Sequence, residues 1–301
     1  MRDRGRRKWW VLGCLGLTAI VVLAVMIVAG LTWWSSRSAD PRSSVFVHPS
    51  PEIDVNPLAG PAQRAAGDAM KILLELDSCE VYIEPSAPGE PLNVEAHYDA
   101  HDYRLEEIVA EEDPDTYHLR FVVTSSRLIT GLKQGIRGGQ PQLRIRLPLE
   151  TPLDLTLVQR NGGAIVDLSG LHVLNADFDA GGALLKIDAD EPLQGELERF
   201  TVKGRQGGLF VESLNLMRPK RVDVDFRMGQ ATLDFRGTWM SDTTVDLSMS
   251  VADAILRLPR EARVDGLNTG PVTPSFGEEL SPPTLTFSVE SGTRTTLRVF
   301  E

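Results

Sequence analysis

Two stretches in the second half of the chain share one pattern, and this pattern decides the fold. They read Asn161-Gly162-Gly163-Ala164-Ile165-Val166-Asp167-Leu168 and Ala180-Gly181-Gly182-Ala183-Leu184-Leu185-Lys186-Ile187. Looser copies follow at 206–211, 228–235 and 251–258. With Gly163, Gly182, Gly208, Gln230 and Asp253 as equivalent positions, the intervals are 19, 26, 22 and 23 residues. A repeat of about 20–25 residues favours a stack of strands in which each unit buries its apolar face on the next.

The small residues of this pattern are predicted to form structural turns. At Gly163, Gly182, Gly208 and Gly229, we expect tight corners where a larger side chain would collide with the next rung of the stack. On this interpretation, Gly182→Val should destabilise the domain by more than about 1 kcal/mol. Two Leu-Pro pairs, ending at Pro148 and Pro259, mark points where one strand should end and the chain should turn into another.

The rest of the chain after residue 67 also has the pattern of strands. Alternating apolar segments are separated by Gly, Pro, Asn or Asp, and helical periodicity is not sustained over ten residues. The predicted strands before the repeats are 70–76, 80–84, 92–96, 103–109, 117–123, 142–147 and 153–158. We therefore predict an all-β, β-solenoid-like domain over residues 67–301, with the repeat stack clearest in 153–265.

The N-terminal segment is predicted to be a transmembrane helix over residues 9–34, which carry no charge. Its apolar body of 22 residues, Val11–Thr32, would span about 33 Å as a helix, against a hydrocarbon core of about 30 Å. Tryptophan pairs bracket this body, and five basic residues precede it. This pattern places the tail 1–8 in the cytoplasm and the rest of the chain outside the cell membrane. The alternative is a cleaved signal peptide, whose apolar region is usually shorter.

Residues 35–66 contain five prolines and are predicted to be an extended linker between membrane and domain. Its apolar residues Val45-Phe46-Val47 could add a short strand to the domain.

Composition excludes several functions. A formal net charge of −11 and a pI near 5.0 disfavour a nucleic-acid-binding protein. Two cysteines provide neither a disulfide framework nor a cysteine-based zinc site. The sequence contains no G-x-S-x-G, Walker A or H-E-x-x-H motif. We therefore predict no catalytic residue and no cofactor.

The aspartates of the repeats are predicted to lie on the outward face of alternating strands. They are Asp167, Asp179, Asp188, Asp190, Asp223, Asp225, Asp234 and Asp246.

Two groups of residues are candidate sites. His97, Asp99 and His101 would lie on one face of a strand, and imidazole with carboxylate suits a divalent transition metal; the alternative, which we favour, is a solvated strand end. Residues 125–149 contain five basic residues and no acidic residue. Within this segment, Arg127, Lys133 and Arg137 could contact lipid headgroups or an anionic polymer, and the alternative is a hairpin connection with ordinary solubilising charge.

The apolar N-terminal segment, the Gly-Gly-Ala rungs and the Leu-Pro corners together resemble the bacterial toast-rack domains. These include LiaF-like regulators of the cell-wall stress response and DUF4097-type adhesin-like proteins. The resemblance covers roughly residues 68–265 and is strongest over 162–258. It implies a β-solenoid-like fold, an envelope location and, in some members, regulation of a membrane histidine kinase. It implies no catalytic motif.

From these observations we predict a non-enzymatic, single-pass protein of the cell membrane. Its extracytoplasmic domain would bind or sense a partner, such as another envelope protein or an anionic polymer. One alternative is a polysaccharide-processing enzyme on a parallel β-helix. Such an enzyme needs a groove lined by aromatic side chains, whereas most aromatic residues here occupy core-phase positions. Another alternative is an assembly subunit that adds strands to its neighbours through an exposed end of the solenoid.

Overall fold

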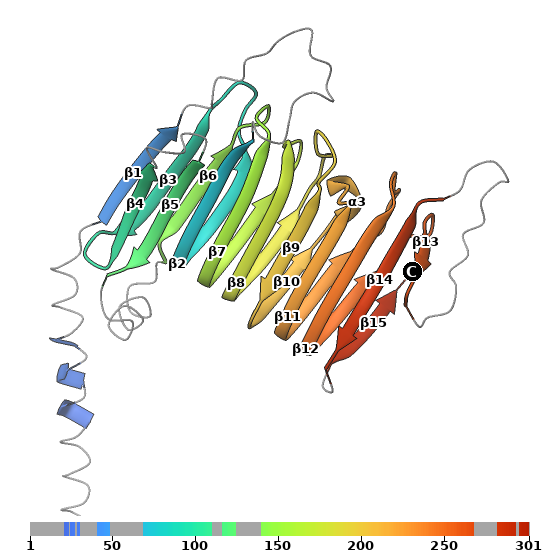
Figure 1. Ribbon diagram of the computed structural model, residues 1–301. Coiled ribbons are helices and arrows are strands. Elements are labelled where there is room, and N and C mark those ends of the chain that lie inside the picture. Colours follow the sequence, from blue (N-terminus) through green and yellow to red (C-terminus); the bar gives the residue numbers. More distant parts are fainter. Residues whose placement is uncertain are drawn as a thin grey trace, which may run out of the picture.

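The computed structural model describes residues 21–23, 25–27, 29–30, 41–48, 69–109, 116–124, 140–267, 282–292 and 295–300. From residue 41 onward, these residues form a hydrogen-bonded network of 15 strands and one short helix, α3 (Leu214–Met217). The prediction of an all-β, solenoid-like domain is therefore confirmed. Figure 1 shows the strands stacked side by side from β2 to β12.

The strands fall into long ones, which recur along the stack, and shorter ones. The long strands are β2 (Met70–Pro85), β7 (Leu153–Asp167), β8 (Val173–Asp188), β11 (Arg221–Asp234) and β12 (Thr243–Arg257). The shorter strands are β1 (Pro41–His48), β3 (Leu92–Asp99), β4 (Tyr103–Val109), β5 (Thr116–Val123), β6 (Gln142–Leu147), β9 (Arg199–Gly204), β10 (Gly207–Val211), β13 (Arg263–Asp265), β14 (Thr284–Ser291) and β15 (Thr296–Phe300).

Each long strand changes phase near its middle. In β12 the buried side chains occupy odd positions up to Met249 and even positions from Ala252 onward. A flat strand would keep one parity along its whole length. The shift means that both halves of the strand direct their apolar side chains to the same core.

The lengths of the connections require a bend at this point. A flat strand with the 15 residues of β7 would span about 46 Å at about 3.3 Å per residue. The segment from Asp167 to Val173 can reach at most about 22 Å. Val173 nevertheless pairs with Leu153 at the start of β7, so the two ends of β7 must lie close together. Each long strand therefore folds back on itself and forms one rung.

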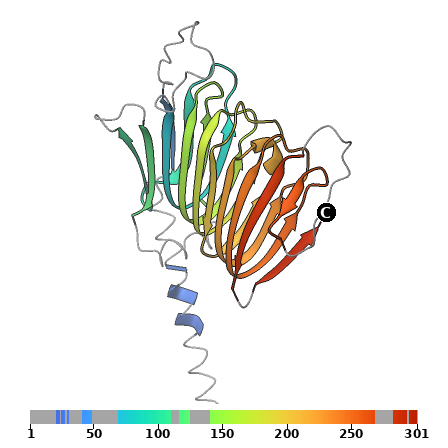
Figure 2. The same cartoon turned by 45° about the vertical axis from the view of Figure 1, so that its right-hand side comes forward.

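The bends divide the network into two facing sheets. The first-half sheet contains β4, β5, the first halves of the long strands, β9, β14 and β13. The second-half sheet contains β1, β3, β6, the second halves of the long strands, β10 and β15. Figure 2 shows how the stacked strands curve along the domain. The core lies between the sheets, where ring pairs such as Phe178–Phe200, with centroids 5.9 Å apart, are fully buried.

Glycines occupy the bend where neighbouring backbones approach most closely. Gly229 has φ +127° and lies opposite Gly207 of the preceding rung. A Cβ atom on Gly229 would overlap the carbonyl oxygen of Gly207. Since this oxygen is backbone and L residues rarely adopt such a φ, the predicted structural turn at Gly229 requires glycine.

The repeat alignment is wrong at one point. Gly163 lies opposite Leu184, whereas Gly182 lies opposite Asn161, so the equivalence of Gly163 and Gly182 is displaced by two residues. The equivalence of Gly208, Gln230 and Asp253 is confirmed. The two copies share the sequence Gly-Gly-Ala, and aligning them on it gave the wrong register. The hydrogen-bond register of parallel strands depends on the length of the corner between them as well as on the local sequence.

The other predicted turn glycines are less constrained than Gly229. A Cβ atom on Gly163 would lie 3.9 Å from the Leu184 carbonyl oxygen. On Gly182 it would lie 3.2 Å from the Asn161 side chain, and on Gly208 it would lie 2.7 Å from a Leu184 methyl carbon. In the last two cases the nearest atom belongs to a flexible side chain, so we expect a smaller cost than at Gly229.

The two Leu-Pro pairs lie at the ends of strands, as predicted. β6 ends at Leu147 and β12 at Arg257, and both Pro148 and Pro259 are buried. A proline cannot donate the next ladder hydrogen bond, so each pair is a natural end point for its strand.

The predicted linker contributes a strand to the second-half sheet. β1 pairs antiparallel with β3 over 41–48, within the predicted linker 35–66, and it includes Val45–Val47. The predicted transmembrane segment 9–34 lies largely outside the described residues. Those of its residues that are described are helical, and no helix in the described part of the chain is both long and apolar enough to cross a membrane.

Candidate binding surface

The outer face of the first-half sheet carries rows of polar side chains. Strand register places Thr201, Asp223, Asp246 and Ser288 in one row and Lys203, Asp225, Ser248 and Glu290 in the next. Neighbouring strands of a sheet lie about 4.8 Å apart, so each row is a ladder of closely spaced hydroxyls, carboxylates and ammonium groups. These side chains line a shallow depression of about 310 Å³ across β9, β11, β12 and β14, called the first-half groove below.

Arg221 organises the carboxylates at one side of the groove. Its guanidinium donates hydrogen bonds to Asp223 and Asp246 at 2.8 Å each. The hydrogen bond to Asp223 contributes most to raising the pKa of Arg221 above its usual value, followed by the charges of Asp223 and Asp246. Within the described residues, Lys203 and Glu290 form no ion pair. The Lys203 ammonium is therefore open to a ligand, and Glu290 lies on the last strand that lines the groove, β14.

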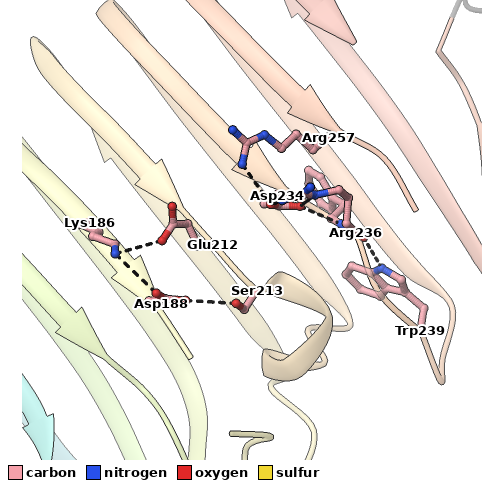
Figure 3. A network of polar contacts seen from close by, with 9 residues as sticks. Lys186, Asp188, Glu212, Ser213, Asp234, Arg236, Trp239 and Arg257 are labelled. Carbon is pink, nitrogen blue, oxygen red and sulfur yellow. Dashed lines mark hydrogen bonds and ion pairs between the residues drawn. The ribbon is translucent and has the colours of Figure 1, made fainter. Parts of the chain in front are cut away.

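A second set of acidic residues lies at the ends of the second-half strands, where their side chains form ion pairs and hydrogen bonds within the domain (Figure 3). Asp188 and Glu212 flank Lys186, whose Nζ lies 3.5 Å and 3.0 Å from their carboxylates. The Ser213 hydroxyl donates to Asp188 at 3.1 Å. The side-chain hydrogen bond to Glu212 is the main cause of the raised pKa of Lys186. These groups satisfy one another across neighbouring rungs.

Asp234 is the most buried acid of this set, with its side chain 9% exposed. Burial alone would raise its pKa, but hydrogen bonds and charge from Arg236, with a further contribution from Arg257, hold the pKa of Asp234 below its usual value. Beside it, the Trp239 ring donates from Nε1 to the Phe235 carbonyl at 2.7 Å (Figure 3). The cluster closes a corner of the solenoid.

Two aspartates make the same turn at equivalent corners. The Asp167 carboxylate accepts a hydrogen bond from the Ser169 amide at 2.9 Å, and Asp234 accepts one from the Arg236 amide at 3.0 Å. Bonds of this kind fix a turn two residues beyond the aspartate. Asp167 and Asp234 therefore shape the corners, although their pattern had suggested outward decoration of the strands.

The predicted histidine cluster does not lie on one continuous strand face. β3 ends at Asp99, and His101 lies in the following turn. The Asp99 carboxylate accepts a hydrogen bond from the His101 amide at 3.0 Å, which fixes that turn. His97 and His101 are both exposed. In the described ranges, no group of three or more His, Cys, Asp or Glu side chains is placed to hold a metal ion.

The predicted basic contact residues Arg127, Lys133 and Arg137 lie outside the described residues. Two further bases of that segment are described, and both belong to the second-half sheet. Arg146 donates to Glu84 at 3.1 Å and Glu95 at 2.7 Å, and Arg144 lies 3.6 Å from Glu84. Their charges are used within the domain, so they do not form a free basic patch.

Sequence reasoning identified some of the groove residues and missed others. It placed Asp223, Asp225 and Asp246 on outward positions of alternating strands. It did not connect them with Lys203 and Glu290, which lie outside the repeat copies that were compared. The alternation within 199–204 and 284–291 was the available signal.

Comparisons with known proteins add no functional assignment. No protein-family model and no curated protein sequence matches the chain. A solved structure from Clostridium sporogenes, provisionally named a cell adhesion protein, is 12% identical, with coverage of 86% of this chain and 99% of its own and a TM-score of 0.35. Provisionally named adhesins from Parabacteroides merdae and Parabacteroides distasonis are each 9% identical, with coverage of 87% of this chain and 97% of their own and TM-scores of 0.30 and 0.29. Likenesses this weak assign no function to this chain.

Proposed function

We propose that this chain is a non-enzymatic, single-pass membrane protein whose extracytoplasmic β domain binds a partner. The membrane anchor rests on the sequence of residues 9–34 and on the basic tail before it. The binding role rests on one observation, the first-half groove with its excess of carboxylates and its Lys203, which forms no ion pair within the described residues.

The charge of the groove indicates the kind of partner. Four carboxylates, from Asp223, Asp225, Asp246 and Glu290, face two cations, from Lys203 and Arg221. An excess of carboxylates repels anionic polymers and attracts basic groups. The rows of hydroxyls and carboxylates can accept hydrogen bonds from a polypeptide or from its lysine and arginine side chains. We therefore favour a basic segment of another envelope protein as the partner.

The distribution of aromatic side chains disfavours the polysaccharide-processing alternative. Sugar-binding grooves use exposed aromatic rings as stacking platforms. Here most of the large rings that are described lie in the core, among them Phe121, Phe178, Phe200, Phe226, Phe235, Trp239 and Phe287, whereas Phe300 is 52% exposed. No aromatic residue lines the first-half groove.

Site-specific photocrosslinking of the full chain in its own membranes tests this proposal. A photoreactive phenylalanine analogue replaces Ser248 in the groove or, as a matched control, Thr232 on the outer face of the second-half sheet. We expect a discrete adduct from position 248 alone, which is lost in the charge-reversal variant Asp225→Lys. Equal adducts from both positions, or an adduct that is insensitive to the charge reversal, would refute the groove as the binding surface.

A further inference from the structure

The C-terminal end of the stack leaves core-facing side chains partly uncovered. The last rung consists of β14 and β15, which both pair with β12. Its inward residues Val289, Leu297 and Val299 are only partly buried. Their counterparts in β12 are covered, with exposed fractions of 2% for Leu247, 1% for Ala254 and 0% for Leu256. The difference arises because nothing among the described residues stacks on the last rung there.

The N-terminal end of the stack is closed in a different way. β6 and β3 pair antiparallel beyond β2 in the second-half sheet, and β5 and β4 do so in the first-half sheet. Inward side chains of these capping strands, such as Ile145 and Phe121, are 0% exposed. The chain therefore caps one end of the solenoid with antiparallel strands and leaves the other without an equivalent cap in the described residues.

The open end presents two strand edges. Among the residues that the structure describes, β14 pairs with β13 only through residues 284–286, and β15 pairs only with β12. Within the described ranges, Gly266 lies against the backbone of Phe287, and 288–291 and 296–300 have no strand on their outer side. An edge of this kind offers backbone N–H and C=O groups to another strand.

We propose that a second copy of this chain closes the open end through a two-fold interface. In the last rung, β14 runs toward the bend and β15 runs away from it. A rotation of 180° about an axis parallel to the strands leaves the direction of every strand unchanged. It places the first-half sheet of one copy above the second-half sheet of the other. It therefore places β14 of each copy antiparallel to β15 of the other. The same contact forms twice, as a closed two-fold dimer requires.

The side chains of the two edges are complementary in this arrangement. Glu290 on β14 and Arg298 on β15 are both outward and exposed, and neither forms an ion pair within the described residues. When Glu290 lies opposite Arg298 of the second copy, Val289 lies opposite Val299 and Ser288 opposite Phe300. Inward residues then face inward residues, and opposite charges meet twice. Phe300, which is 52% exposed, becomes partly covered.

Disulfide trapping of the full chain in its membranes tests this contact. The variant Ser288→Cys/Phe300→Cys is made in a Cys14→Ser background, with Cys79 retained because it is buried. Within one copy, positions 288 and 300 lie on the outer faces of opposite sheets, whose backbones are about 10 Å apart, so a disulfide between them requires two copies. Oxidation should give a covalent dimer from this variant and none from either single cysteine variant. Failure to form the dimer, or equal trapping by the off-register pair Thr286→Cys/Phe300→Cys, would overturn the proposal.

Charge exchange gives an independent test by sedimentation of the full chain in detergent. Glu290→Arg and Arg298→Glu should each weaken dimerisation about tenfold, because each places like charges opposite one another at two contacts. The double exchange Glu290→Arg/Arg298→Glu should restore the affinity, and a double variant as weak as the singles would contradict the contact. Arg298 lies outside the first-half groove. Arg298→Glu should therefore leave the photocrosslink from position 248 intact, which separates this inference from the proposed function.

Discussion

The substitution Gly229→Ala tests the bent-rung architecture at one of its most crowded points. The added Cβ would overlap the carbonyl oxygen of Gly207, and the backbone of Gly229 has φ +127°. Neither obstacle can be removed by turning a side chain. The two rungs must separate locally, or residue 229 must leave the conformation that the bend requires.

The expected cost follows from two contributions. A non-glycine residue in a sparsely populated φ region costs about 1–3 kcal/mol, and forcing packed elements apart costs about 1–3 kcal/mol. We expect a loss of about 3 kcal/mol in the free energy of unfolding. For a domain of roughly 200 residues this lowers Tm by about 6–12 °C. Gly182→Ala is the matched control, since its nearest neighbour is the Asn161 side chain at 3.2 Å, and it should cost less than about 1 kcal/mol.

Thermal unfolding of the purified protein, followed by far-ultraviolet circular dichroism, measures both variants against the parent. The test is whether Gly229→Ala lowers Tm more than Gly182→Ala does. If Gly182→Ala proved as damaging as Gly229→Ala, or if Gly229→Ala left Tm unchanged, the bend and the register described for the rungs would be wrong.

Three further predictions concern individual side chains. Arg236 is the main cause that lowers the pKa of Asp234 in the folded protein. Ionised Asp234 therefore stabilises the fold at pH values above the unfolded-state pKa, and this stabilisation is lost as pH falls through the folded-state pKa. The variant Asp234→Asn should lose about 1 kcal/mol of stability at pH 7, and its Tm should fall less steeply toward pH 3 than that of the parent. Burial, and then the nearby acids, raise the pKa of the Cys79 thiol, so in a Cys14→Ser background a thiol reagent should label it on the order of 100-fold faster in denaturant than in the folded protein. Tm should be the same with EDTA as with added zinc, and a rise of several degrees with zinc that is lost in His97→Ala would instead establish a metal site.

The sequence predicts the class of fold because that information is local. Alternation and turn residues locate strands such as 142–147 and 103–109, which the structure reproduces at the same bounds. The bend within each long strand is less visible. Residues 70–76 and 80–84 are predicted as separate strands, whereas β2 runs continuously through Asp77-Ser78-Cys79. Both halves are correct, but the pattern does not show that the backbone ladder continues between them.

Register and surface assembly depend on distant parts of the chain, and here local patterns fail. The displacement between Gly163 and Gly182 depends on the corner between β7 and β8 and on a register shift at Leu153/Asp154. The first-half groove combines side chains from Thr201 to Glu290, so it exists only once the register is known. Similarly, the sequence around Asp167 and Asp234 has the alternating pattern of outward-facing aspartates. Only their position at the end of a strand shows that they fix turns.

The most direct test of the proposed function is the side of the membrane on which the domain lies. A membrane-impermeant maleimide is applied to intact spheroplasts that produce the full chain with one added cysteine, in a Cys14→Ser background. Ser248→Cys lies in the first-half groove and should be labelled in intact spheroplasts. Arg4→Cys in the basic tail should be labelled only after the membrane is opened. Labelling of Arg4→Cys but not Ser248→Cys in intact spheroplasts would contradict an extracytoplasmic binding domain.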